Sequence, residues 1–452
     1  MRPGVSLLLV FSLLLCTWAE NAEDSPFRAV ILKNGIHALA EQFPDFPLVH
    51  LVVAIRAGSK YEPAVQRGIS HLMEHLILFG KDNTGQSSFS ERLRERGGFL
   101  NGHTDRDLVT LEITLPRSEL EFVVGLAREM TFARRFFQKD LEREREIIRN
   151  ETAEVQDNPE LRGLFVMLNH LFSGHPYARS ALGDVTALDS ISVEEISRHY
   201  EALFRPERSA IVLVGDVEPE IVIAGIKERL GDVRVPAFAN DRESVAVPPL
   251  PPLTESHVIE RSMDVEQAHI WLGFRAPAYN HADRVTMRVL SQMLGQGGYS
   301  LLSASLSSRF QLVSAVSMNY QALEESGFAW IHMVLDPGHV KRARNEVMRF
   351  LKYFRTMDFS LRDLPPARRR GVFDFLATAE NQLRLRSETG GEDGMDRALS
   401  YARFLLLNRL GKPKSFLERM SALSPSMLRG AAGDYLLKPP HVMVTVLPEK
   451  AR

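Results

Sequence analysis

Two apolar runs that lie 219 residues apart share one pattern of side chains. Residues 49–57 read Val-His-Leu-Val-Val-Ala-Ile-Arg-Ala, residues 268–276 read Ala-His-Ile-Trp-Leu-Gly-Phe-Arg-Ala, and both runs end in Arg-Ala. Each run is short and rich in β-branched or aromatic side chains, which predicts a buried β-strand. The repeated pattern indicates that the chain contains two similar halves.

Looser matches extend this correspondence toward the end of each half. The matched segments are 182–183 with 410–411, 188–192 with 423–424, 200–206 with 435–440, and 210–214 with 442–447. Four prolines within residues 240–254 predict an extended linker between the halves. We therefore predict an N-terminal domain at 23–240, a Pro-rich linker at 241–254 and a homologous C-terminal domain at 255–452. Each domain is predicted to be α+β, a mixed β-sheet covered on one face by helices.

A helix with two histidines is predicted soon after the first strand. Residues 71–75 read His-Leu-Met-Glu-His, with Ser70 as the expected N-terminal cap and Gly80 as the end of the helix. Positions i and i+4 lie on one face of a helix, so His71 and His75 can bind the same metal ion with Glu74 beside it.

This arrangement suits metal-assisted hydrolysis. Zinc held by neutral imidazoles keeps a position open for water and lowers the pKa of that water to about 7. A neighbouring carboxylate must accept the proton, and Glu74 is the candidate general base. The 219-residue offset places Leu290, Met293 and Leu294 at the corresponding positions of the second half, so only the first half can bind this metal. Since apolar residues serve at these positions in the second half, the alternative that the histidines are ordinary core residues is weakened.

A third protein ligand is expected from the charged, helix-patterned segment 138–157. It contains five glutamates, Glu142, Glu144, Glu146, Glu151 and Glu154, and the pattern alone does not choose among them. Glu144 and Glu151 are two turns apart on one face, so both can face the same point, one as a ligand and one behind it. The remaining histidines show no ligand spacing and are expected to be surface or core residues.

Taken with Glu144 and Glu151, the His-x-x-Glu-His motif resembles the pitrilysin/insulinase family of zinc peptidases, the inverzincins. Other segments agree with that family: residues 97–104 (Gly-Gly-Phe-Leu-Asn-Gly-His-Thr), 158–159, 175–177, 183, 213–216, and, in the second half, the strand at His269 and 297–298. The resemblance covers nearly all of the chain after residue 22.

The resemblance implies roles for five residues. His71, His75 and Glu151 would bind one Zn²⁺ per chain, Glu74 would be the general base, and Glu144 would support the site from behind the ligands. It also implies one half of a clamshell-shaped peptidase that encloses its substrate, which favours unfolded peptides over folded proteins.

The resemblance further assigns a substrate-binding strand. Asn101, Gly102, His103 and Thr104 would form the edge of an active-site strand, to which an extended peptide adds through backbone hydrogen bonds. A hairpin or turn next to a strand is the alternative for this segment. His103 replaces the small residue usual in the family and would alter substrate preference.

One departure from the family concerns an Arg and a Tyr, seven residues apart, that a second homologous half supplies to the active site. Here the Tyr position, within residues 307–316, contains Ser314 with no Arg seven residues before it, and the nearby Arg309 and Tyr320 are wrongly spaced. We therefore expect a homologous partner subunit to supply the pair in a heterodimer. A homodimer that works without the pair is the alternative.

Composition and the first residues add the cellular context. The chain has 452 residues with a net charge of -2 and no long basic run, which argues against nucleic acid as a partner. Residues 1–22, with Arg2 before an apolar stretch, resemble a secretory signal peptide, and no later stretch reaches the roughly 20 apolar residues that a membrane span needs. The only cysteine, Cys16, lies in this leader; a lipid anchor there is an alternative, disfavoured by the large Leu15.

These features together predict a zinc-dependent endopeptidase that cleaves peptides or unfolded polypeptides outside the cytoplasm, either secreted or periplasmic. The alternative function is a non-catalytic peptide-binding or assembly subunit, for which loss of the metal motif is expected. A mitochondrial presequence-processing subunit conflicts with a leader that has a single Arg and an apolar core.

Overall fold

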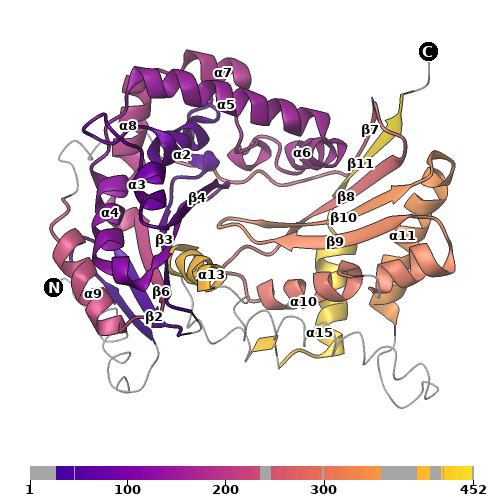
Figure 1. Ribbon diagram of the computed structural model, residues 1–452. Coiled ribbons are helices and arrows are strands. Elements are labelled where there is room, and N and C mark those ends of the chain that lie inside the picture. The colour runs from indigo at the N-terminus through magenta and orange to yellow at the C-terminus, as the bar shows by residue number, and fades with distance from the viewer. Residues whose placement is uncertain are drawn as a thin grey trace, which may run out of the picture.

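The computed structural model describes residues 27–44, 46–234, 246–297, 300–357, 394–407, 419–420 and 422–449. The predicted leader with Cys16, residues 241–245 of the predicted linker and Gly298 lie outside these residues. The described chain forms two β-sheets, one in each half, with helices packed around both (Figure 1).

The first sheet has six strands in the order β1-β2-β6-β3-β5-β4. They are β1 Phe27–Ile31, β2 His37–Gln42, β3 Leu48–Ile55, β4 Phe99–Thr104, β5 Val109–Pro116 and β6 Ser209–Gly215. The helices of this half are α2 Ile69–Phe79, α3 Phe89–Arg94, α4 Leu120–Phe132, α5 Gln138–Asp157, α6 Pro159–Leu171, α7 Val185–Ser190, α8 Val193–Leu203 and α9 Pro219–Leu230. Alternate β3 residues, such as Val49 and Leu51, point into a core shared with α2, α4, α8 and α9.

The second sheet has five strands in the order β7-β11-β8-β10-β9. They are β7 His257–Met263, β8 Ala268–Ala276, β9 Ala315–Gln321, β10 Gly327–Leu335 and β11 His441–Pro448. The described helices are α10 Arg284–Gly295, α11 Val340–Thr356, α13 Gly394–Leu407 and α15 Pro425–Ala431, with π-helical turns η7 Ser303–Arg309 and η9 Ala432–Leu437. Ile270 and Leu272 of β8 share a core with α10, α11 and α15.

The two sheets have the same topology apart from the extra strand β1. In the first sheet, β6 pairs parallel with β2 and antiparallel with the long central strand β3. In the second sheet, β11 pairs in the same way, parallel with β7 and antiparallel with β8. The central strand then pairs antiparallel with β5 or β10, and this strand with the edge strand β4 or β9. The prediction of two similar α+β halves, each with a mixed sheet, is confirmed.

Helices exchanged between the halves cover the second face of each sheet, a feature that the sequence did not predict. Ala398 and Ala402 of α13 pack against Val52 and Val212 of the first sheet. In turn, α6 of the first half packs on β8 and β11 of the second sheet (Figure 1). A Cβ atom on Gly163 of α6 would lie 2.4 Å from the ring of Trp271, so glycine permits this close approach.

The domain boundaries stay predictions. Residues 246–254, the described part of the Pro-rich segment, contain no helix or strand. Within the residues that the structure describes, no helix combines the length and the apolar character that a bilayer span requires.

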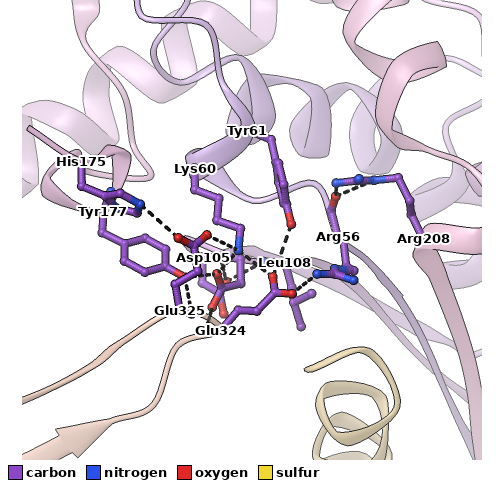
Figure 2. A network of polar contacts seen from close by, with 11 residues as sticks. Arg56, Lys60, Tyr61, Asp105, Leu108, His175, Tyr177, Arg208, Glu324 and Glu325 are labelled. Atoms are coloured by element: carbon purple, nitrogen blue, oxygen red, sulfur yellow. Dashed lines mark hydrogen bonds and ion pairs between the residues drawn. The ribbon is translucent and has the colours of Figure 1, made fainter. Parts of the chain in front are cut away.

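A buried polar network joins the turn between β9 and β10 to the first half (Figure 2). The Lys60 side chain is 1% exposed, and its Nζ lies 2.9 Å from Asp107 Oδ1, 2.6 Å from Glu324 Oε2 and 3.4 Å from Glu325 Oε1. The Tyr177 hydroxyl donates to Asp107 at 2.6 Å, and the Glu324 backbone N–H donates to the same carboxylate at 2.8 Å. One buried ammonium thus holds carboxylates from both halves together.

We predict that Lys60→Met destabilises the protein by about 3 kcal/mol, because it removes the cation among buried carboxylates and leaves their charges uncompensated. Urea unfolding followed by circular dichroism measures the loss. Lys438→Met is the matched control, since Lys438 pairs with Asp434 on an exposed helix surface and such pairs contribute little. Equal stability of the Lys60 and Lys438 variants would contradict the prediction.

Candidate metal centre

The helix that carries the histidines begins earlier than predicted. Gly68, with a φ of 92°, is the N-cap of α2, so the prediction that Ser70 caps the helix is wrong. The carboxylate of Glu62 accepts hydrogen bonds from the backbone N–H groups of Gly68, at 2.9 Å, and Ser70, at 3.0 Å. The Glu62 side chain thus accepts from the free backbone N–H groups at the start of α2, in place of a capping side chain. Gly80 ends the helix, as expected.

Three donor atoms converge where α2 meets α5. The Nε2 atoms of His71 and His75 each lie 3.7 Å from Oε2 of Glu151. The two imidazole rings are 4.7 Å apart between centroids and nearly perpendicular, at 88°. Both rings therefore present the same type of nitrogen to one carboxylate oxygen.

Glu144 lies on the same face of α5 as Glu151 and contacts the other ring nitrogen of His75. Its side chain is 0% exposed, and His75 Nδ1 donates to Glu144 Oε2 at 3.2 Å. Arg143 donates to Glu144 Oε1 at 2.9 Å and to the Phe79 carbonyl at 2.7 Å, which ties α5 to the end of α2. Such a carboxylate behind a histidine fixes the tautomer and turns the other nitrogen toward the site.

The two imidazoles have different protonation behaviour. Burial, followed by the nearby His75 and His103, lowers the pKa of His71 to about 3. Its Nδ1 has no hydrogen-bond partner among the described residues. Burial alone would lower the pKa of His75, but the hydrogen bond to Glu144 and the charges of Glu151 and Glu74 raise it above its usual value.

Glu74 is buried beside the histidines. Burial, opposed by the Thr104 hydrogen bond and the charge of His75, raises the pKa of this carboxyl to about 7. The Thr104 hydroxyl donates to Glu74 Oε2 at 2.5 Å. A Cβ atom on Gly102 would lie 2.9 Å from Glu74 Oε1, so glycine lets β4 lie against α2 here. A carboxyl with a pKa near 7 can take up and release a proton at neutral pH.

The predicted substrate-binding segment forms β4, which pairs antiparallel with β5 as a hairpin at the edge of the first sheet. Within the described part of the chain, β4 lies at the end of the first sheet and pairs only with β5. Asn101 and His103 are exposed, whereas Thr104 is buried and Gly102 is half-buried. The side chain of Thr104 thus lies on the face of β4 that packs against α2 and Glu74, and strand alternation puts Asn101 and His103 on the opposite face.

This donor set fits zinc. Two neutral imidazole nitrogens and one carboxylate oxygen form the three-ligand set of many catalytic zinc sites. The carboxylate of Glu144 accepts the supporting hydrogen bond from His75. The corresponding helix of the second half, α10, has Leu290, Met293 and Leu294 buried in its apolar core instead.

Among the described residues near the expected position, Ser314, Tyr320 and Arg309 do not form the Arg and Tyr pair of the family. Tyr320 is 7% exposed, and its hydroxyl donates to the Pro277 carbonyl at 2.6 Å. Ser314, at the expected Tyr position, donates to the Val334 carbonyl at 3.0 Å. Arg309 stacks its guanidinium on the Phe310 ring, 5.0 Å from the centroid.

Three contributors were not predicted from the sequence. Glu62 lies too far before α2 for capping rules to find it, and Thr104 was assigned to substrate. Arg143 immediately precedes Glu144 on α5, and adjacent helical residues do not face each other. Its long side chain nevertheless bends back far enough to donate to the Glu144 carboxylate.

Two family models match the chain, one within the first half and one that begins near the end of the first half and continues into the second. Residues 38–185 match the model described as "Insulinase (Peptidase family M16)", and residues 190–370 match the "Peptidase M16 inactive domain". The chain belongs to peptidase family M16. The predicted resemblance is therefore confirmed, and the region that matches the inactive-domain model contains α10, which has Leu290, Met293 and Leu294 where α2 has His71, Glu74 and His75.

M16 relatives agree with this membership. "Zinc protease PqqE" of Helicobacter pylori is 23% identical over 385 residues, which cover 83% of this chain and 86% of the relative. The crystal structure of a protease from Helicobacter pylori superposes with a TM-score of 0.83 at 20% identity, covering 93% of this chain and 99% of that one. The periplasmic protease PqqL from Escherichia coli has a TM-score of 0.75 at 16% identity and matches 94% of this M16 chain, but only 48% of its own. The structural matches show a common fold.

We predict that Glu144→Gln weakens zinc binding by roughly 10- to 100-fold, because the amide holds His75 less firmly than the carboxylate does. Competition with a chromophoric chelator measures the dissociation constant. Glu142→Gln makes the same change of charge at an exposed position of α5 and should leave the affinity unchanged. An equal loss in both variants would show that helix charge, not the contact with His75, is responsible.

Proposed function

We propose that this M16 chain is a zinc-dependent endopeptidase that hydrolyses peptides or unfolded polypeptides. The observation that carries the proposal is the convergence of His71 Nε2, His75 Nε2 and Glu151 Oε2. Glu74, whose pKa is about 7, is buried next to these atoms. The name of the PqqE relative, a zinc protease, supports the same chemistry.

His71, His75 and Glu151 would hold the ion. Bound there, zinc would act as a Lewis acid that polarises the scissile carbonyl and activates water. Glu74 accepts the proton of the attacking water and can pass it to the departing amine, which its near-neutral pKa permits. Thr104 keeps the Glu74 carboxylate in place, and Glu144 keeps His75 in the tautomer with its Nε2 toward Glu151.

The substrate is proposed to add to β4 as an extra strand. β4 has β5 on one side and ends the sheet on the other, so its outer backbone groups can pair with an extended peptide. Asn101 and His103, together with Phe99, which is 64% exposed, line the face that alternate substrate side chains would meet. A peptide must be extended to pair in this way, which favours unfolded substrates.

A homologous partner half is proposed to complete the site. In this chain Ser314 stands at the expected Tyr position and Tyr320 is held in the fold by Pro277. The chain of PqqL is about twice as long as the region that matches this chain, and a structure described as the first half of PqqL also matches, which supports a second half beside the matched one. A heterodimer with a half that lacks the metal motif is our first choice, and a homodimer the second.

The site is proposed to work outside the cytoplasm. The predicted leader at residues 1–22 supports export, and the PqqL relative is described as periplasmic. The alternative, a non-catalytic peptide-binding or assembly subunit, gives no role to a buried carboxyl that titrates near neutrality beside two histidines.

We predict that Glu74→Gln lowers kcat by roughly 100- to 10,000-fold, because the amide cannot accept a proton, while one zinc per chain is retained. Peptide hydrolysis and metal analysis on the same preparation measure both. Glu154→Gln, at an exposed position of α5, should keep full activity. Unchanged peptide hydrolysis by Glu74→Gln would show that Glu74 is not the general base. Retained biological activity in a Glu74→Gln variant that no longer hydrolyses peptides would favour the non-catalytic alternative.

We further predict that the purified chain alone hydrolyses peptides slowly and that a homologous half without the metal motif restores the rate. The reason is that Arg and Tyr are missing from their usual positions in this chain. Peptide hydrolysis with and without the partner, beside size-exclusion chromatography of the mixture, tests this. A lone chain as active as the mixture would reject the partner.

A further inference from the structure

A second group of metal-ligating side chains lies where α6 crosses the second sheet. One ligand atom each from Glu160, His269 and His332 lie within 4.8 Å of one another. Glu160 belongs to the first turn of α6, in the first half, whereas His269 of β8 and His332 of β10 belong to the second half. The cluster therefore spans the contact between the two halves.

Strand register and stacking hold the two histidines in place. β10 pairs with β8 so that His332 lies opposite Trp271 and Val334 opposite His269, which makes the histidines diagonal neighbours on one face. The Trp271 ring stacks on His332, with centroids 4.6 Å apart and planes at 20°, and lies nearly parallel to His269, at 11°. The rings are thus positioned before any ligand arrives.

The separation of the two nitrogens suits one metal ion. His269 Nδ1 lies 3.2 Å from His332 Nε2. Two nitrogen ligands at about 2.0–2.1 Å from a tetrahedral zinc ion lie about 3.3–3.4 Å apart. A hydrogen bond between the imidazoles is the metal-free form of the same contact, and when an ion binds, the shared proton moves to the far nitrogen of its own ring.

Glu160 completes a mixed ligand set. It is exposed, so its carboxylate can turn toward the two rings and an ion can enter from solvent. Two imidazoles and one carboxylate suit Zn²⁺ and similar transition metals better than Ca²⁺ or Mg²⁺, which prefer oxygen ligands.

We propose that Glu160, His269 and His332 form a second, structural binding site for a divalent transition metal such as Zn²⁺, separate from the centre on α2. An ion there ties the start of α6 to β8 and β10. Because only Asn158 lies between α5 and α6, the same ion fixes the end of the helix that carries Glu151. The proposal does not depend on peptidase activity.

The test uses the full chain with its first centre removed, His71→Ala/His75→Ala, loaded with ZnCl₂ and then desalted. We expect one zinc per chain by mass spectrometry of the metal, and a rise in Tm on adding zinc. Adding His332→Gln should remove both the ion and the rise, and Glu160→Gln, which changes an exposed residue and spares the fold, should weaken zinc binding at least about tenfold.

His257→Gln is the matched control. His257 and His170 also form a histidine pair between β7 and α6, with centroids 5.7 Å apart, but they belong to no three-ligand group among the described residues. This variant should keep the zinc. The proposal is overturned if the double variant binds no zinc, or if His332→Gln and Glu160→Gln leave its stoichiometry and affinity unchanged.

Discussion

Both faces of each β-sheet must be covered, and this chain meets that requirement by exchanging helices between its halves. α13 covers one face of the first sheet, and α6 covers one face of the second. Each half therefore depends on the other for its buried surface. α6 follows directly on α5, so the packing of α6 on β8 and β11 also sets where α5 presents Glu144 and Glu151 to α2. The candidate metal centre in the first half thus depends on contacts made in the second.

Features determined within a few residues of chain were predictable. The apolar runs at 49–57 and 268–276 became β3 and β8, and the charged segment 138–157 became α5 with the predicted bounds. The i, i+4 spacing of His71 and His75 set them on one face, because helix geometry alone decides that. Glu144 and Glu151 could be paired by the same rule, although their roles came from the family resemblance.

Features that depend on distant chain segments were not predictable. Ser70 is a residue type that often caps helices. In the folded chain, however, the N–H groups at the start of α2 donate to the carboxylate of Glu62. Periodicity shows that a face of α6 is apolar, but not that the face meets the other sheet. His269 and His332 are adjacent because β8 and β10 pair in one particular register, so no ligand spacing in the sequence could indicate them.

The comparison of α2 with α10 shows that the polar residues of the first half are buried at a cost in stability. The second half fills the equivalent positions with Leu290, Met293 and Leu294, and the same scaffold remains intact. In the first half, burial lowers the pKa of His71 and raises the pKa of Glu74. Burying these polar side chains therefore costs more free energy than burying apolar side chains at the same positions would. A cation bound by the two imidazoles and Glu151 would offset this desolvation cost, because its positive charge attracts the lone pairs of the nitrogen and oxygen ligands. The polar residues therefore make physical sense on α2 as parts of a binding site, and not as parts of a core.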